Sequence, residues 1–174
     1  PATAVRFAQS RPIEWRCVIH SAQPRNADDP YVQELKALDT QHRVDFSLKP
    51  LPYAQIDELL SSARIGLVLY SSEVGQNTSA VGLASGKLSH FLKLGVPVIV
   101  SPLPGLADFV VEHGVGVVLH QPSDAARLIA QIEADFEGFR ARARACFDEH
   151  LSYDRAFRAV LEVTDRWYPS AQAL

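Results

Sequence analysis

Short apolar runs alternate along the chain with segments in which apolar residues recur every three or four positions. Residues 65–70 and 96–100 are nearly all apolar and lack the polar alternation of a half-exposed strand. Runs of this length predict β-strands, and strands that are apolar on both sides are typical of a parallel sheet covered on both faces. The periodic segments between the runs predict amphipathic helices.

Strands and helices are predicted to alternate five times. We expect strands at residues 15–21, 44–47, 65–70, 96–100 and 117–119. We expect helices at residues 31–38, 53–63, 87–94, 106–112, 124–132, 136–149 and 153–167, after a weakly patterned segment at 1–13. This order predicts an α/β fold, with a Rossmann-like, doubly wound parallel sheet in three α/β/α layers and right-handed crossovers. No repeat or boundary divides the chain, so we predict one domain over residues 1–174.

The helical periodicity also predicts which side chains face the core. The inward positions are expected to be Ile56, Leu59 and Leu60 in the helix at 53–63, and Phe157, Val160, Leu161 and Trp167 in the last helix. Ser123 and Ser152 are predicted to cap the helices that follow them, because a serine hydroxyl can accept from the first free N–H groups of a helix.

Composition restricts the class of protein. The 174 residues are 47% hydrophobic and 21% charged, which is ordinary for a globular domain with a full core. The net charge of −3 argues against a nucleic-acid-binding face, which is usually basic. Cys17 and Cys146 have no metal-ligand spacing, so we expect two reduced core thiols and neither a metal nor another cofactor.

No apolar run reaches the length of a membrane span, and no signal-peptide pattern is present. We therefore expect a cytoplasmic location, with the inner face of the membrane as an alternative. The chain begins at Pro1 and contains no methionine, so we expect a fragment whose natural start lies upstream.

The segment at residues 79–105 holds the strongest candidate for a binding site, next to the longest predicted loop at 71–84. Gly86 and Lys87 open the predicted helix, and Gly95 is placed to end it, as glycine does just past a C-cap. Free N–H groups and the positive end of the dipole favour an anion at a helix N-terminus. Lys87 opposes that dipole, so a bound phosphate would favour a cation there; a solvated surface lysine remains the alternative.

Two nucleotide-binding motifs are absent. A P-loop requires GxxxxGK followed by Ser or Thr, whereas Leu88 follows Lys87 and Val81 occupies the position of the first glycine. The Gly-Val-Gly at 114–116 precedes a strand instead of linking a strand to a helix, so it is no dinucleotide fingerprint. The six histidines show no metal-ligand pairing, and His20, at a predicted strand end near the expected ligand face, fits a structural or a functional role equally well.

Residues 85–110, SGKLSHFLKLGVPVIVSPLPGLADFV, resemble the donor-binding signature of the GT-B-fold glycosyltransferases of the retaining, group 1 type. That signature is Lys-Leu-x-Glu-Tyr-Leu, two small residues and then Gly-x-Pro-Val-Ile. Asp108 stands where the family commonly has Glu, and the resemblance extends over residues 15–168. The matching residues are Lys87, Leu88, Phe91, Leu92, Gly95, Pro97, Val98 and Ile99.

The resemblance implies the C-terminal, donor-binding lobe of a hexosyltransferase, of the kind used in polysaccharide biosynthesis. Such a lobe binds a nucleotide diphosphate sugar, and the transfer retains the anomeric configuration. The ammonium group of Lys87 would offset the charge of the leaving diphosphate, with help from the loop N–H groups. The loop residues are Ala84, Ser85, Gly86 and Leu88. The acceptor would bind an absent N-terminal lobe, so we expect the fragment alone to be inactive, and the resemblance identifies no catalytic residue.

Two positions depart from the family pattern. The family often carries two glutamates eight positions apart, the second of which holds the nucleotide ribose, and Gly82 and His90 stand there. His90 can hydrogen-bond to a ribose hydroxyl but supplies no fixed negative charge. Glu73 can replace the first glutamate near the sugar, or be a solvated loop carboxylate. These departures keep open a non-catalytic Rossmann-like binding or scaffold domain, and a lobe of a nucleotide-sugar epimerase.

Overall fold

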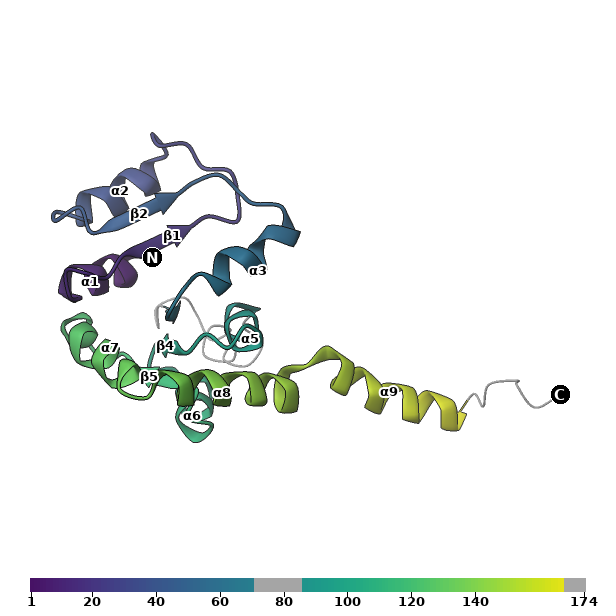
Figure 1. Cartoon of the computed structure of the whole chain (residues 1–174). Helices are drawn as coiled ribbons and strands as arrows, with labels where there is room; N and C mark the ends of the chain where they lie inside the picture. Colours follow the sequence, from purple (N-terminus) through teal and green to yellow (C-terminus); the bar gives the residue numbers. More distant parts are fainter. Residues whose placement is uncertain (71–85, 168–174) are drawn as a thin grey trace.

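The computed structural model describes residues 1–70 and 86–167, in which helices and parallel strands alternate (Figure 1). The strands are β1 (Cys17–His20), β2 (Val44–Ser47), β3 (Gly66–Val68), β4 (Val98–Val100) and β5 (Gly116–Val118). The helices are α1 (Ala2–Ser10), α2 (Pro30–Leu38), α3 (Tyr53–Ser61), α5 (Gly86–Lys93), α6 (Leu106–Glu112), α7 (Ala125–Glu133), α8 (Phe136–Cys146) and α9 (Tyr153–Trp167). The predicted α/β class is confirmed.

The strands form two sheets instead of the single sheet that the alternation predicts. β1 pairs with β2, and β3, β4 and β5 pair in that order, all in parallel. Among the described residues, no backbone hydrogen bond joins β1 to β3. A continuous, doubly wound sheet is therefore not formed by these five strands alone.

The three-stranded sheet has a core on each face. Alternate residues of β4 point to opposite faces, so that Val98 and Val100 lie in one buried cluster and Ile99 lies in the other. Leu88 of α5 belongs to the first cluster, and Phe7 of α1 belongs to the second. All five of these side chains are buried, which explains why the sequence of this strand lacks polar alternation.

Helix α5 ends where the sequence predicts. Gly95 has φ of +70°, a left-handed conformation that costs glycine little. Its N–H donates to the Leu92 carbonyl, and the Val96 N–H donates to the Phe91 carbonyl over 2.9 Å. This pair of bonds is a Schellman motif, which satisfies the last carbonyl groups of the helix and turns the chain into β4.

Three predictions about the other helices are wrong or incomplete. Asp124, not Ser123, accepts a bond from the Gln121 N–H, because a short 3₁₀ turn, Pro122–Asp124, precedes α7. The helix predicted at 136–149 changes at Cys146, and a π-helical turn, Phe147–Leu151, leads toward α9. In α3 the predicted inward residues are only half-buried.

The last helix does not pack inward as predicted. It extends away from the rest of the protein (Figure 1), and its predicted core positions are exposed. These positions are Phe157, Val160, Leu161 and Trp167. The amphipathic pattern identified an apolar face, but not a surface that would cover it. None of the helices in the described part of the chain is both long enough and apolar enough to cross a membrane.

Candidate functional site

The carboxyl ends of β3 and β4 meet at a buried hydroxyl. Ser101, the residue after β4, is 4% exposed. Its hydroxyl accepts from the Tyr70 N–H over 2.8 Å and donates to the Tyr70 carbonyl over 2.9 Å. The Ser101 N–H in turn donates to the Val68 carbonyl. These bonds hold the end of one strand against the other and fix the backbone from which the Tyr70 ring projects.

Lys87 lies beside that tyrosine. It is in the first turn of α5 and exposed, and its ammonium nitrogen is 4.5 Å from the centroid of the Tyr70 ring. A cation over the face of an aromatic ring is attracted by the ring quadrupole. No ion pair between described residues includes Lys87. The ring thus positions the ammonium group, and no described carboxylate neutralises it.

The next cation along this helix is paired. Lys93 donates to the Asp57 carboxylate of α3 over 2.6 Å. That hydrogen bond raises the pKa of Lys93 and lowers the pKa of Asp57. The two lysines of α5 therefore differ. Lys93 has a carboxylate partner, whereas Lys87, at the N-terminus of the helix, has none among the described residues.

His90 lies one turn after Lys87 and faces α3. Its Nε2 atom is 3.4 Å from the Tyr53 hydroxyl, and the two rings lie 6.1 Å apart. Tyr53 is 80% exposed and His90 is half-buried, so the tyrosine hydroxyl beside the imidazole is open to a ligand. Both groups can donate or accept a hydrogen bond.

The predicted site residues divide into two sets. Gly86, Lys87, Leu88 and His90 lie together on α5, whereas Ala84, Ser85, Gly82 and Glu73 lie outside the described residues. The Leu88 side chain is fully buried in the core, so only its backbone can face a ligand. A Cβ atom added at Gly86 would meet no atom of residues 1–70 or 86–167 within 4 Å.

Asp108 has a structural role. Its carboxylate accepts from the Gly105 N–H over 3.2 Å, three residues before it, and so caps the start of α6. Among residues 1–70 and 86–167, no group of three or more histidine, cysteine or acidic side chains is placed to hold a metal. Cys17 and Cys146 are buried free thiols, as predicted.

Sequence reasoning missed Ser101, Tyr70 and Tyr53. The first two carry a signal that could have been used, because functional groups of parallel α/β folds gather at the carboxyl ends of strands. Ser101 directly follows β4, and Tyr70 ends the apolar run at residues 65–70. Tyr53 gives no such signal, because it is 37 positions from His90. Its role depends on how α3 packs against α5.

The fold and the site together define a class: a parallel α/β domain with a lysine at a helix N-terminus, beside the carboxyl ends of its strands, that has no counter-charge among the described residues. Residues 35–145, more than half of the chain, match the model of the glucosyltransferase 3-like C-terminal domain family. The chain belongs to this family, which makes it a glycosyltransferase-related domain. A search of curated proteins found no match.

Proposed function

We propose that this domain binds the nucleotide diphosphate sugar of a glycosyltransferase, with the diphosphate at the N-terminus of α5. The observation that carries the proposal is Lys87, which is held over the Tyr70 ring and has no carboxylate partner among the described residues. A diphosphate would supply the missing negative charge, and the N–H groups of the helix start would add donors. The family match supports a sugar donor as the source of that diphosphate.

The chemistry assigned to Lys87 is stabilisation of the leaving group. Breaking the bond between the sugar and the diphosphate transfers negative charge to the phosphate oxygen. A preplaced ammonium group stabilises that charge more than it stabilises the intact donor, which is the condition for lowering a barrier. His90, one turn along the same helix, and the hydroxyl of Tyr53 on α3 would bind the ribose.

The finer architecture is part of the proposal. We infer a Rossmann-like, three-layer lobe of a GT-B enzyme, whose acceptor binds a second lobe and whose transfer retains the anomeric configuration. The parallel strands and the helix-covered three-stranded sheet support the Rossmann-like lobe. The second, acceptor-binding lobe and the retention of configuration follow from the resemblance of residues 85–110 to the donor-binding signature.

The experiment is a thermal-shift panel with UDP, GDP, ADP, TDP, CMP and their sugar conjugates. At 100-fold excess over its dissociation constant, a ligand stabilises the native state by about 2.7 kcal/mol. Lys87→Ala should weaken binding by about 10- to 100-fold, since a charge-assisted bond contributes about 1.5–3 kcal/mol. The matched control is Lys93→Ala, which removes the same charge from the same helix at the paired position.

The comparison between the two variants decides the assignment. Loss of the shift in Lys87→Ala, with the shift retained in Lys93→Ala, supports a diphosphate at the helix start. Equal losses would indicate a general electrostatic effect and would refute the assignment. Pyrophosphate in the same panel separates the phosphate contact from the ribose contact, because only the nucleotides can reach His90.

A non-catalytic binding or scaffold domain is the second candidate. The specific observation in its favour is His90, where the family often has a glutamate and where the imidazole already has the Tyr53 hydroxyl as a partner. In that case no member of the panel should shift the melting temperature, either alone or with an acceptor-binding lobe present.

A further inference from the structure

The π-helical turn Phe147–Leu151 is the junction between α8 and α9, and α9 extends from it away from the rest of the protein (Figure 1). Phe147 and Leu151, at the two ends of the turn, pack against the buried cluster that contains Leu88 and Val98. Single π-helical turns are rare and are often found at functional positions. The packing of this turn sets the direction in which α9 leaves the domain.

His150, within this turn, stacks on a second histidine. The centroids of the His150 and His113 rings lie 4.4 Å apart, and the ring planes are inclined by 38°. His113 is the C-cap residue of α6. Phe109, one turn earlier in α6, meets both rings edge-on, with centroids 4.4 Å from His113 and 6.0 Å from His150. Three rings thus connect the turn to the end of α6.

This contact depends on the charge of the two imidazoles. Neutral aromatic rings attract one another at such separations. Histidine is the side chain that ordinarily gains its positive charge between about pH 8 and pH 5. Two charged rings with centroids 4.4 Å apart repel each other, and salt screens this repulsion little because the Debye length is about 8 Å at physiological ionic strength.

Nearby charged groups offset one of these charges but not both. On the turn itself, a carboxylate oxygen of Glu149 lies 3.7 Å from Nε2 of His150. On α8, Arg142 donates to the carbonyl of Gly114, the residue after His113, and so brings another cation toward the end of α6. No ion pair between described residues includes His113. Protonated His150 therefore has a counter-charge, whereas protonated His113 has none in the described part of the chain.

The other ionisable groups on the elements packed around the turn do not change this balance. Asp108 of α6 accepts from the Gly105 N–H, and Lys93 of α5 pairs with Asp57. Burial raises the pKa of the Cys146 thiol, directly before the turn, to about 11, so it stays neutral over the same range. The remaining charged residues near the junction, none of which forms an ion pair with either ring, are Glu112 on α6, Asp148 on the turn, Arg144 on α8, and Asp154 and Arg155 on α9.

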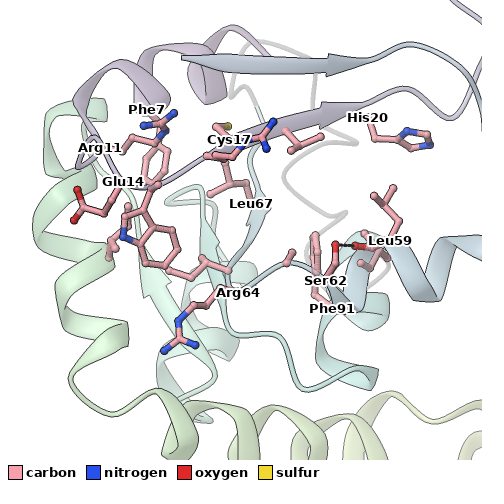
Figure 2. A pocket seen from close by; sticks show the side chains of 17 residues that line it. Phe7, Arg11, Glu14, Cys17, His20, Leu59, Ser62, Arg64, Leu67 and Phe91 are labelled. Atoms are coloured by element: carbon pink, nitrogen blue, oxygen red, sulfur yellow. Dashed lines mark hydrogen bonds between the residues drawn. The ribbon is translucent and has the colours of Figure 1, made fainter. Parts of the chain in front are cut away.

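Histidines elsewhere in the domain face neutral groups. Nδ1 of His20, at the end of β1 (Figure 2), lies 3.0 Å from the Ser47 hydroxyl, and His90 lies beside the Tyr53 hydroxyl. Protonation of such a ring creates one charge, and the neighbouring hydroxyl can accept a hydrogen bond from it. Among the described histidines, only the rings at the junction contact each other. Repulsion between two cationic rings is therefore confined to the junction.

We propose that His113 and His150 form a pH-sensitive hinge for α9. Above about pH 7 the neutral rings stack and hold the π-helical turn against α6. Below about pH 6 both rings are charged, the stack opens, and α9 changes its direction relative to the domain. The hinge shares no residue with the proposed donor site.

The test measures the direction of α9 in the 174-residue chain at pH 8 and pH 5. Spin labels at two exposed positions, through Gln131→Cys on α7 and Glu162→Cys on α9, report the distance between the domain and the helix. The two natural cysteines are buried and are not labelled in the folded chain. His113→Asn and His150→Asn each keep hydrogen-bonding groups but remove one titrating ring. His120→Asn, which replaces an exposed histidine after β5, is the matched control.

We expect the distance between the labels to change between pH 8 and pH 5 in the unsubstituted histidine background and in His120→Asn. Glu162 lies about 18 Å along the helix from His150, so a swing of about 20° moves its label by about 6 Å. Neither His113→Asn nor His150→Asn should show the change. The same distance at both pH values in the unsubstituted background, or a change that persists in His113→Asn, would overturn the proposal.

A titration followed by nuclear magnetic resonance tests the repulsion without labels. The charge on His150 should form first, beside Glu149, and then oppose the charge on His113. We therefore expect His113 to titrate about one pH unit lower in the unsubstituted chain than in His150→Asn, a tenfold change in its proton affinity. His150 is exposed, so this replacement should leave the fold intact. Equal midpoints for His113 in the two chains would show that the rings do not repel each other and would refute the hinge.

Discussion

Replacing Ser101 by alanine tests how the candidate site is built. The hydroxyl is buried and makes two hydrogen bonds, of 2.8 and 2.9 Å, with the backbone of Tyr70. Alanine fits the same space, so the change removes the bonds with little effect on packing. Tyr70 would lose both bonds at the end of β3, next to the ring that positions Lys87.

The magnitude follows from the number of bonds and their burial. A typical intramolecular hydrogen bond contributes about 0.5–1.5 kcal/mol net, so the two bonds together contribute about 2 kcal/mol. For a chain of this length, about 2 kcal/mol corresponds to a fall in melting temperature of about 4–8 °C. The m-value should not change, because the surface exposed on unfolding stays the same.

Urea unfolding of Ser101→Ala and of a matched control measures this loss. Ser61 in α3 also donates a hydroxyl bond of 2.9 Å, to the Glu58 carbonyl, but it is exposed. Ser61→Ala should change the free energy of unfolding by no more than about 0.5 kcal/mol. If Ser101→Ala lost no more than this control, the two bonds would not stabilise the strand ends and the reasoning would be refuted.

Two further predictions concern packing and protonation. Gly116→Ala should lower the free energy of unfolding in urea by about 1–3 kcal/mol or more, because its Cβ would lie 2.0 Å from the Val98 carbonyl oxygen. Gly86→Ala is the control and should not destabilise the chain. Equal losses of unfolding free energy in the two variants would contradict this account. Burial raises the pKa of Cys17 and Cys146 from 9.0 to about 11. The folded state thus keeps protons that the unfolded chain loses, so stability should be full below about pH 9 and fall toward pH 11. Iodoacetamide at pH 8 should label both thiols in urea but neither in the native chain, and native labelling would contradict their burial.

Local signals allowed some elements to be predicted with their correct bounds. The strand at Val44–Ser47 and the helix at Leu106–Glu112 were both predicted as observed. Proline or glycine residues lie close to these elements and restrict where a strand or helix can extend. Gly95 likewise identified the end of α5, because glycine tolerates the left-handed conformation that it adopts there.

Pairing between distant segments could not be predicted in the same way. The apolar runs predicted five strands, but their division into two sheets depends on which edges meet, and a single sequence contains no direct signal for that. The exposed face of α9 is a related case. Periodicity shows that Phe157 and Leu161 share a face of the helix. Whether another part of the protein covers that face depends on tertiary packing, and in the structure both side chains are exposed.

The candidate site shows the same division. Gly86 and Lys87 were placed at a helix N-terminus from local pattern, and the structure confirms that position. The bonds between Ser101 and Tyr70 and between Tyr53 and His90 join residues that are 31 and 37 positions apart. They arise from the packing of β3 against β4 and of α3 against α5, which no local pattern specifies.

The proposed donor site lies at the carboxyl end of β3, beside the point where the order of the strands reverses. From β1 the chain continues to β2 on one side, whereas from β3 it continues to β4 on the other side. In doubly wound sheets, ligands bind outside the carboxyl ends of the strands at the point where the strand order reverses. His20 ends β1 at this point, and Tyr70 follows β3. The proposed donor site therefore lies where doubly wound folds bind their ligands.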